Sequence, residues 1–590
     1  MPFDIDGQYI GLLRVSTHKS NFTGESPTCQ WAIDPIPSIM RVFAIFCLFF
    51  VSCKLFGAQH AAVATVDPIA TDAAIAAMKQ GGNAVDGAVA AGLTLGVVNG
   101  YNSGIGGGGF MVIRLANGKF VVIDGREVAP AAANRDMYIK DGKPETRASK
   151  VGARASGVPG ALAAYELAVR KHGKLPLKWH LENAAKIAEE GFKIPSAYAG
   201  RIRATAHDLR KFESSSAILL NTDGKSHEAG KSLRQPDLAK TYRSIAKEGI
   251  GWFYGGAFAA ATEKWMKANG GIMTARDLAN YKPKLRAPVR VNYRGYEIVS
   301  MPPPSSGGVH VGQILNILEN FDLKKMKPNS ADFIHLVTEA MKLAFADRAH
   351  WLGDADFVPV PRGLIDKKYA KGLAKRIRMD RVTKVAEHGT PPRSTEDLFN
   401  KHTTHFSCAD SEGNWVACTA TVNTSFGSKV IIPGTGVIMN NEMDDFSIAP
   451  GVPNAFGLLG AEANAVAPGK RPLSSMSPTI VLKDGKPILA VGAAGGPTII
   501  TQTLLAIIHT IDFGLGVKAA LAQPHFHHQW APNQMRIERK VSENVLAELR
   551  KRGHTLKVYN QMGATQAVSL RNGKLDAAHD PRLKGKATRY

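Results

Sequence analysis

The sequence predicts an α+β protein whose central pair of β-sheets is covered by helices. Segments with strand-like patterning occur around residues 110–124 and return after residue 405, whereas the long middle of the chain has mostly helical patterning. Strands from distant parts of the sequence then have to meet in shared sheets, so we expect one compact layered unit rather than separable domains. The chain of 590 residues, 44% of them apolar, is long enough to bury a large core.

The first half of the chain supplies helices and two strand pairs. Residues 67–98 are expected to form two helices, with Thr71 or Asp72 capping the first and Gly81-Gly82 ending it. Strands at 110–114 and 120–124 flank Asn117-Gly118, a strong hairpin signal. We also expect helices through 157–280, a strand pair at 290–300, and a long buried helix from the spacing of Phe333, Leu336, Val337, Met341 and Phe345.

The second half follows a polar segment, residues 386–400, with little apolar content. Strands are expected at 406–422, around a turn at 410–414, and at 437–440, 478–482 and 488–491, with helices at 498–511 and 542–552. Cys408 and Cys418 fall on the two arms of the first hairpin and have no CxxC spacing. They therefore predict neither a disulfide framework nor a zinc site.

The formal net charge of +23 invites comparison with nucleic-acid-binding proteins. The positive residues are scattered, however, with no run of five or more Lys or Arg and no zinc-finger spacing. We interpret the charge as a basic surface and predict no nucleic-acid partner.

The beginning of the chain resembles an export signal. Arg41 precedes an apolar run at 42–51, which is shorter than the roughly 20 residues needed to span a bilayer but suits the core of a signal peptide. We therefore expect residues 40–58 to be a signal peptide, and residues 1–39 to be a mis-called start or a non-folding leader. The prediction is a periplasmic or secreted protein without a stable membrane span.

Two motifs superficially suggest cofactor or metal sites. Residues 104–109 match the GxGxxG pattern, but a helix and loop precede them and a strand follows, whereas a dinucleotide site needs the reverse order. We expect a densely packed turn in the core instead. His525, His527 and His528 have no neighbouring cluster of carboxylates or cysteines, so a structural polar role is favoured over metal binding.

The junction at Lys401-His402-Thr403-Thr404-His405 carries the first catalytic hypothesis. It joins the polar segment to a predicted buried strand. Cleavage before Thr403 would give that residue a free α-amino group, whose pKa of roughly 8 lets it accept the proton of its own hydroxyl. Nucleophile and base would then be one residue, a known variant of covalent catalysis.

Other residues could complete an acyl-transfer site around Thr403. Gly495-Gly496, between a predicted strand and helix, can present two backbone N–H groups to an oxyanion. Arg126 can bind a carboxylate through two parallel hydrogen bonds, and Ser474-Ser475 offer hydroxyl groups. Glu442 and Asp445 offer negative charge to an ammonium group. Such a pocket suits the head group of an amino acid.

Several ordered motifs resemble those of γ-glutamyltranspeptidases over roughly residues 60–585. Those before residue 402 are Gly106–Phe110, Asp124-Gly125-Arg126-Glu127, Met301-Pro302-Pro303-Pro304-Ser305-Ser306-Gly307-Gly308 and Phe345-Ala346-Asp347-Arg348. Those after it are Thr403-Thr404-His405, Thr421-Val422-Asn423, Asn440-Asn441-Glu442-Met443-Asp444-Asp445-Phe446-Ser447, Arg471-Pro472-Leu473-Ser474-Ser475-Met476-Ser477-Pro478 and Gly495-Gly496.

The resemblance implies the N-terminal-nucleophile hydrolase fold, a four-layer αββα sandwich that cleaves itself between His402 and Thr403. Residues 59–402 would form the large subunit and 403–590 the small one. The implied roles are Thr403 as nucleophile, Thr421 as support for its amino group, and Gly495 and Gly496 as oxyanion donors. By the same resemblance, Arg126, Ser474 and Ser475 would hold the substrate α-carboxylate, and Asn423, Glu442 and Asp445 its α-ammonium.

The resemblance also implies the substrates: glutathione and related γ-glutamyl donors, with water, amino acids or short peptides as acceptors, and no metal or organic cofactor. Phe456 lies in a segment similar to the lid loop over the substrate, where bacterial relatives commonly carry tyrosine. Because phenylalanine lacks the hydroxyl, we expect this loop to be held less tightly over the site. A cephalosporin (glutaryl) acylase of the same fold is the first alternative, although the Glu442/Asp445 pair favours a glutamyl head group. An unprocessed, non-catalytic binding protein is the second.

Overall fold

The computed structural model describes residues 60–392, 405–449 and 451–590. Internal contacts divide the chain into Met1–Ala58 and Gln59–Tyr590, and all the described residues belong to the second unit. The predictions for residues 1–39 and 40–58, and for cleavage between His402 and Thr403, lie outside the described residues. Within the described part of the chain, no helix combines the length and apolar character that a bilayer crossing requires.

The first sheet interleaves strands from both halves of the chain. Every adjacent pair is antiparallel, and β11 and β12 lie in the middle, between β1 and β2. Segments on either side of residue 402 thus share one sheet. In spatial order its strands are β20 (Lys586–Arg589), β1 (Ala61–Thr65), β11 (His405–Asp410), β12 (Trp415–Thr421), β2 (Gly108–Arg114), β3 (Phe120–Gly125) and β8 (Lys284–Arg286).

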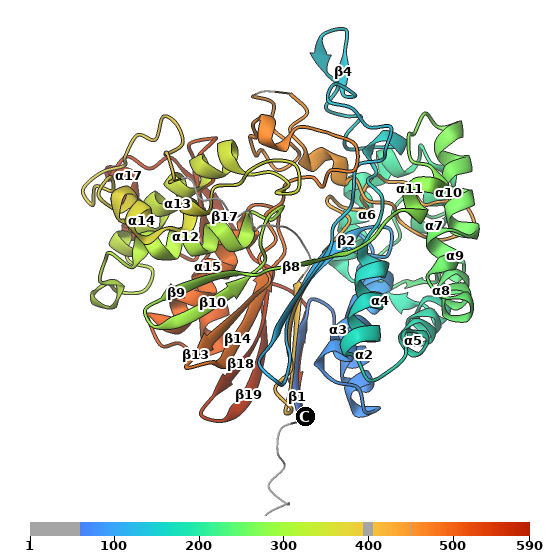
Figure 1. Cartoon of the computed structure of the whole chain (residues 1–590), viewed down its shortest axis with the longest axis horizontal. Helices are drawn as coiled ribbons and strands as arrows, with labels where there is room; N and C mark the ends of the chain where they lie inside the picture. Colours follow the sequence, from blue (N-terminus) through green and yellow to red (C-terminus); the bar gives the residue numbers. More distant parts are fainter. Residues whose placement is uncertain (1–59, 393–404, 450) are drawn as a thin grey trace, which may run out of the picture. The chain divides into compact units, whose positions relative to one another are not determined.

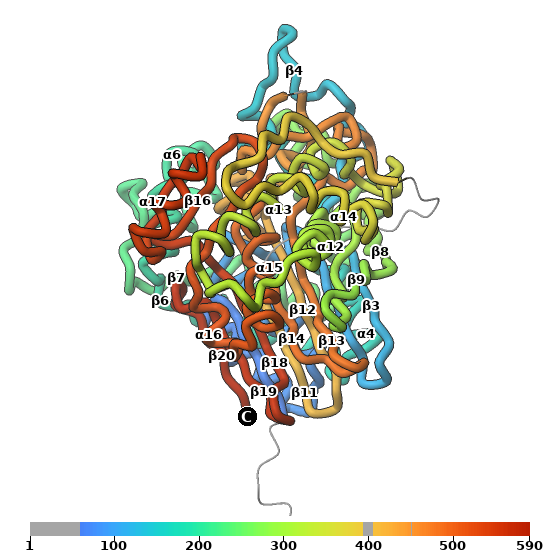
Figure 2. Tube along the Cα trace, turned by 90° about the vertical axis from the view of Figure 1, so that its left-hand side faces the viewer, coloured from blue at the N-terminus to red at the C-terminus, as the bar shows by residue number. Residues whose placement is uncertain are grey.

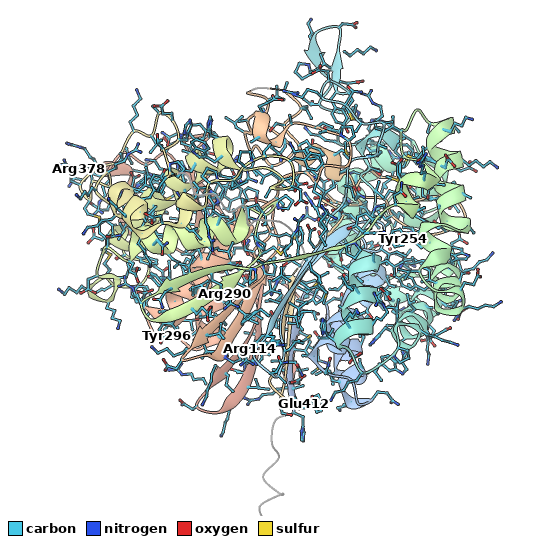
Figure 3. The ribbon with its side chains drawn as sticks, viewed as in Figure 1. Arg114, Tyr254, Arg290, Tyr296, Arg378 and Glu412 are labelled. Carbon is cyan, nitrogen blue, oxygen red and sulfur yellow. The ribbon has the colours of Figure 1, made fainter. Side chains whose placement is uncertain are left out.

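The second sheet is also antiparallel and stacks on the first. Alternate side chains of the two sheets meet in a shared apolar core, with Phe110 and Trp415 from the first and Ile480 and Val568 from the second. Arg290 lies 4.9 Å from the ring centre of Phe120 at the edge of this core (Figure 3). In order the strands are β19 (Lys574–His579), β18 (Thr565–Arg571), β14 (Lys486–Ala493), β13 (Thr479–Lys483), β10 (Tyr296–Ser300) and β9 (Val289–Tyr293).

Helices cover the outer face of each sheet, which confirms the predicted four-layer αββα sandwich (Figure 1). On the first sheet lie α2 (Pro68–Lys79), α3 (Ala84–Val98) and α4 (Ala161–His172), and α5 (Leu177–Glu190) packs on α3. On the second lie α12 (Gly307–Leu318) and α15 (Thr498–Ile511), and α13 (Ala331–Trp351) packs on α12. Figure 2 shows α12 and α15 in front of the second sheet.

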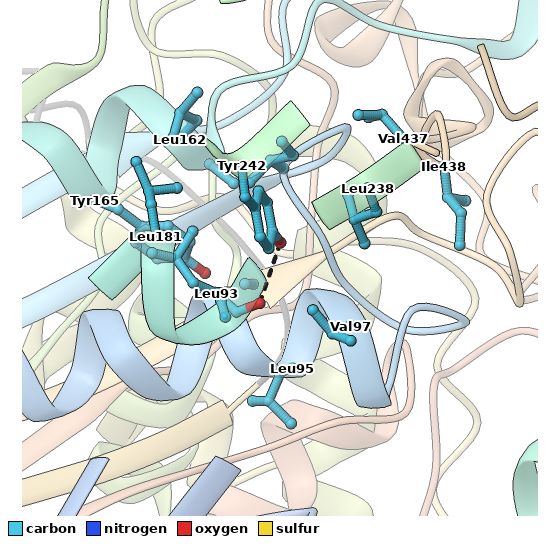
Figure 4. Packing of buried hydrophobic residues seen from close by; sticks show 14 of the residues in the cluster. Leu93, Leu95, Val97, Leu162, Tyr165, Leu181, Leu238, Tyr242, Val437 and Ile438 are labelled. Atoms are coloured by element: carbon cyan, nitrogen blue, oxygen red, sulfur yellow. Dashed lines mark hydrogen bonds between the residues drawn. The ribbon is translucent and has the colours of Figure 1, made fainter. Parts of the chain in front are cut away.

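The remaining elements extend these layers. In the first helical layer, α8 (Pro236–Glu248) packs on α5, and its Tyr242 donates a hydrogen bond to the Leu93 carbonyl of α3 at 3.1 Å (Figure 4). The other helices are α6 (Ser196–Leu209), α7 (Glu213–Leu219), α8 (Pro236–Glu248), α9 (Gly251–Tyr254), α10 (Ala257–Ala268), α11 (Ala275–Ala279), α14 (Lys367–Ala374), α16 (Val517–Leu521) and α17 (Glu543–Lys551). The short strands are β4 (Ile139–Lys140), β5 (Lys143–Pro144), β6 (Phe192–Lys193), β7 (Ser232–Leu233), β15 (Phe526–His527), β16 (Met535–Glu538) and β17 (Leu556–Tyr559).

Two local predictions are wrong. The first helix begins earlier than expected because Asp67 caps it, accepting a hydrogen bond from the Ile69 N–H at 2.9 Å, so neither Thr71 nor Asp72 is the cap. Residues 437–440 are not a strand and form only an isolated bridge between Ile431 and Ile438. The predicted hairpins and long helices, by contrast, are confirmed.

The glycine-rich segment is a close backbone crossing, as predicted. A Cβ on Gly106 would lie 2.1 Å from the Ile438 oxygen, and one on Gly107 would lie 1.8 Å from the Thr421 oxygen. The segment leads directly into β2. Because they lack a Cβ, these glycines let the backbone at Thr421 and Ile438 pack directly against the segment before β2.

Candidate active site

Seven of the residues predicted from the sequence line one cavity of about 240 Å³. They come from the end of β12, from the loops before β13, and from the turn between β14 and α15. The cavity wall comprises the predicted Thr421, Asn423, Asp445, Phe456, Ser475, Gly495 and Gly496, together with Asn102, Arg201, Thr424, Ser425, Leu458 and Ala494. Arg126, Glu442 and Ser474 lie buried behind this wall, and His402 and Thr403 lie outside the described residues.

Gly495 and Gly496 form the turn between β14 and α15. Both have positive φ, of 129° and 60°, and a Cβ on Gly496 would lie 2.6 Å from the ring of Phe456. Among the described residues, no group accepts a hydrogen bond from either N–H. Two unpaired donors in a cavity wall at a helix start can stabilise a negatively charged oxygen.

We call Arg126, Glu127, Glu442 and Asp445 the acidic corner. Arg126 follows β3 and is fully buried; its Nη1 forms an ion pair with Glu442, and its Nη2 lies 2.9 Å from Asp445 Oδ2. Glu127 Oε2 lies 3.4 Å from Arg126 Nη1. The guanidinium is thus engaged by the protein's own carboxylates, and its role in holding a substrate carboxylate stays a prediction.

Burial dominates the electrostatics of the acidic corner. It raises the pKa of Glu127 to about 7 and the pKa of Glu442 well above its usual range, while the charge of Arg126 opposes both shifts. Burial alone would lower the pKa of Arg126, but Glu442, Glu127 and Asp445 together raise it. Burial thus favours the protonated form of both glutamates, and the adjacent Arg126 guanidinium favours their charged form.

We call Ser306, Arg348, Ser474 and Ser475 the hydroxyl corner. Arg348, near the end of α13, donates from Nη2 to Ser475 Oγ at 3.3 Å and to the Ser474 carbonyl at 3.4 Å. Its Nε donates to Ser306 Oγ at 3.0 Å. Ser474 is joined to Ser305 by a β-bridge, which fixes the loop before β13 against the start of α12.

Thr421 and Asn423 form the wall nearest the first sheet. Thr421 is the last residue of β12, and its Oγ1 accepts a hydrogen bond from the Asn423 N–H at 2.7 Å. Asn423 has a left-handed φ of 75°, and its Nδ2 donates to the Asn441 carbonyl at 2.9 Å. Both side chains are held in place at the cavity.

The segment around Phe456 closes part of the cavity and is tied to two aspartates. Asn454 Nδ2 donates to Asp445 Oδ1 at 3.1 Å, and the Ala455 N–H donates to Asp444 Oδ2 at 2.8 Å. Gln529 Nε2 donates to the Gly457 carbonyl at 3.0 Å. These hydrogen bonds hold the segment in place without a hydroxyl at position 456. That the loop is held less tightly than one with tyrosine stays a prediction.

The fold also brings to this site residues that the sequence did not single out. Asn102 and Arg201 line the cavity, whereas Glu127 and Arg348 lie behind it. Glu127 and Arg348 belong to the quoted motifs, but nothing in their spacing indicates which distant groups they contact. Arg201 lies on α6 and makes no ion pair or side-chain hydrogen bond with the described residues, so only the folded chain reveals its place.

The histidines have protein partners. His527 hydrogen-bonds Thr501 and Gln529, at 3.2 and 3.1 Å, and His528 accepts from the Trp530 N–H at 3.1 Å, consistent with the predicted structural role. A cluster that the sequence did not indicate is His335, Glu339 and His554. Its two rings share a 2.7 Å hydrogen bond, and Lys342 donates to Glu339 at 2.8 Å, so protein groups satisfy these side chains.

Comparison with known proteins gives the family. Residues 70–590 match the model of gamma-glutamyltranspeptidase. A glutathione hydrolase proenzyme of Escherichia coli (strain K12) is 44% identical over 528 residues, covering 89% of this chain and 91% of that protein. This chain belongs to the γ-glutamyltranspeptidase family.

Solved structures agree with this assignment. A cephalosporin acylase from Bacillus halodurans superposes with a TM-score of 0.80 at 28% identity, covering 90% of this chain and 96% of that one. A Helicobacter pylori gamma-glutamyltranspeptidase chain is 42% identical, with a TM-score of 0.54, and covers 55% of this chain and 94% of its own. The γ-glutamyltranspeptidase fold is thus shared with acylases, and the head-group pocket has to distinguish the two activities.

Proposed function

We propose that this protein transfers and hydrolyses γ-glutamyl groups through a γ-glutamyl ester on Thr403. It is a self-cleaving γ-glutamyltransferase and hydrolase by family, and glutathione is the donor that the E. coli relative's name suggests. The observation that carries the proposal is the cavity lined by Thr421, Asn423, Asp445, Ser475 and the Gly495–Gly496 turn. It offers one acidic end, one hydroxyl end and two unpaired N–H donors.

Chain geometry supports Thr403 as the nucleophile of this cavity. β11 begins at His405, which pairs with Thr419, two residues before Thr421 in β12. The strand that follows the proposed nucleophile in sequence therefore starts beside the strand that carries Thr421 into the cavity wall. A hydrogen bond donated by the new amino group to Thr421 Oγ1 would orient that group as the base.

The proposed chemistry has two stages. In the precursor, Thr403 Oγ attacks the His402 carbonyl and the peptide C–N bond breaks, so the acyl group moves to Oγ and the α-amino group is released with the hydroxyl proton. Water then hydrolyses the ester, which frees the Thr403 hydroxyl and separates the two chains. In turnover, that amine accepts the hydroxyl proton as Oγ attacks the donor's γ-carbonyl. The N–H groups of Gly495 and Gly496 stabilise the oxyanion. The leaving amine then takes the proton, and water or an acceptor amine resolves the ester.

The two ends of the cavity would hold the glutamyl head group. Asp445, Glu442 and Asn423 would receive the ammonium, and Ser474 and Ser475 the carboxylate, with Arg126 bridging the acidic residues. A glutaryl group has no ammonium, so an acid-rich end favours the glutamyl donor over the acylase alternative. Arg201 at the cavity wall offers a cation to the terminal carboxylate of a leaving or accepting dipeptide.

The finer assembly follows the same proposal. Residues 59–402 and 403–590 would form a large and a small subunit that remain one αββα unit, because β11 and β12 lie between β1 and β2. Residues 40–58 would direct export to the periplasm or the medium.

A denaturing gel and an anilide assay test the proposal together. The wild type should give two bands at the sizes expected for a cut before Thr403 and release p-nitroaniline from a γ-glutamyl anilide, faster with glycylglycine. Thr403→Ala should give one band and no release. Turnover by uncleaved Thr403→Ala would contradict the proposed nucleophile.

A further inference from the structure

Arg348 differs from every other buried arginine of the described residues. Three arginines are almost fully buried: Arg126, Arg348 and Arg471, with 0%, 3% and 2% of their surface exposed. Arg126 has Glu442 and Asp445 as partners, and Arg471 lies 3.4 Å from Asp124. Within the described chain, no carboxylate lies at ion-pair distance from Arg348.

A buried cation without a counter-ion is costly, so its neighbours matter. All three recorded acceptors of Arg348 are neutral: Ser306 Oγ, the Ser474 carbonyl and Ser475 Oγ. Burial lowers its pKa to about 10, with the charge of Asp445 opposing the shift. Since Asp445 already pairs with Arg126, the hydroxyl corner has surplus positive charge.

Ser475 connects this charge to the cavity. Its hydroxyl oxygen accepts the Arg348 hydrogen bond, and Ser475 is part of the cavity wall. Because its oxygen accepts from Arg348, the Ser475 proton is free to point toward an anion in the cavity. Donation by Arg348 also polarises that hydroxyl, which strengthens the bond it donates.

We propose that Arg348 is a positioning residue for the α-carboxylate of the γ-glutamyl substrate. It orients the Ser475 hydroxyl to donate a hydrogen bond to that carboxylate, and it supplies the positive charge that the carboxylate neutralises. This inference rests on the proposed function and adds the residue that makes its carboxylate end positive. It also explains how a carboxylate can bind while Arg126 remains engaged with acids. The selected ligand class is an acyl donor with a carboxylate α to an amine.

The test measures discrimination between two p-nitroanilides, one γ-glutamyl and one 4-aminobutyryl, which lacks only the α-carboxylate. In Arg348→Met, the ratio of kcat/KM for the two should fall about 30-fold, through KM more than kcat. Arg348→Lys, which keeps the charge, should recover part of the ratio. Arg471→Met is the matched control, because it removes a buried arginine that has a carboxylate partner and does not contact Ser475.

The outcomes separate this inference from the proposed function. If the wild type hydrolyses neither anilide, the proposed function fails. If the wild type is active and Arg348→Met loses equally on both donors, or Arg348→Lys recovers nothing, the role of Arg348 is overturned. Two bands on a denaturing gel verify that each variant folds and cleaves itself. If Arg348→Met does not fold, Arg348→Lys serves instead: a ratio of kcat/KM below that of the wild type but above one supports the role of Arg348, and an unchanged ratio overturns it.

Discussion

The acidic corner and the hydroxyl corner hold the same functional group, a buried guanidinium, in opposite surroundings. Arg126 has carboxylates of Glu127, Glu442 and Asp445 around it, whereas Arg348 has two hydroxyls and a carbonyl. The first corner thus places three carboxyl groups around one guanidinium, and the second places none around the other. Under the proposed function, a zwitterionic head group would bind between them in one orientation, with its ammonium at Asp445 and its carboxylate at Ser475.

The two corners show that the side chain of a buried residue does not by itself determine its role, because the neighbouring groups decide whether its charge is compensated. The sequence motif predicts that Arg126 binds a carboxylate, and the structure shows carboxyl groups of the protein itself around its guanidinium. Arg348 is compensated only when a ligand brings an anion.

The largest effect is expected from Asp445→Asn, which removes the acidic charge at the cavity wall. It also leaves Arg126 with one partner fewer, and breaking a buried ion pair costs about 3–5 kcal/mol. We expect kcat/KM for the γ-glutamyl anilide to fall by about 10²–10³-fold. The matched control is Asp136→Asn, an exposed aspartate at 3.9 Å from Arg135; equal losses in both variants would count against the acidic corner.

Gly496→Ala tests the donors that lie between the two corners. The new Cβ would lie 2.6 Å from the Phe456 ring, so the turn or the ring has to move. We expect kcat to fall by about 10²-fold, the effect of disturbing an oxyanion donor. Gly514→Ala is the control: its φ of 64° resembles the 60° of Gly496, but nothing lies within 4 Å of its Cβ. A similar loss in both would attribute the effect to backbone strain.

Arg201→Gln tests a cation outside the head-group pocket. Since Arg201 lines the cavity and has no ionic partner among the described residues, it should contact the carboxylate of the leaving dipeptide. The ratio of kcat/KM for glutathione to that for the γ-glutamyl anilide should fall about 10-fold. Arg203→Gln, on the same helix but away from the cavity wall, should leave the ratio unchanged; an unchanged ratio in Arg201→Gln would remove Arg201 from substrate recognition.

The smallest effect concerns the proton held by the acidic corner. Folded Glu127 releases its proton near pH 7 because burial raises its pKa, whereas an unfolded glutamate releases it near pH 4.3. The folded state binds more protons in this window, so its free energy of unfolding falls as pH rises from about 4.3 to 7. Glu127→Gln removes this term, and its Tm relative to the wild type should rise across the same window. A constant difference in Tm would contradict the buried acid pair.

Much of the fold could be predicted because its signals are local. The Asn117-Gly118 turn, the helical spacing after Phe333, and the glycine pair at 495–496 each specify a nearby element, and all are found. The strand β1 and the final strands β18, β19 and β20 were not predicted. β1 is the short run Ala61–Thr65, whose pairing depends on β11 and β20 rather than on its own composition.

The site could be predicted in part, for a related reason. The motifs identify which residue types gather at the cavity, and seven of the predicted residues do line it. They do not identify pairing partners, because Arg126 contacts Glu442 across 316 positions and Arg348 contacts Ser475 across 127. Segment 437–440 fails as a strand for the same reason: Asn440 bonds to Gly106 and Gly157, far away in sequence.

The most direct test of the two-corner account is a crossed measurement on three p-nitroanilides: γ-glutamyl, glutaryl, which lacks the ammonium, and 4-aminobutyryl, which lacks the carboxylate. Asp445→Asn and Ser475→Ala are assayed for kcat/KM on each. We predict that Asp445→Asn loses most on the two donors with an ammonium, and that Ser475→Ala loses most on the two with a carboxylate. The prediction is contradicted if each variant loses the same factor in kcat/KM on all three donors. It is also contradicted if Asp445→Asn loses most on the donors with a carboxylate and Ser475→Ala on those with an ammonium.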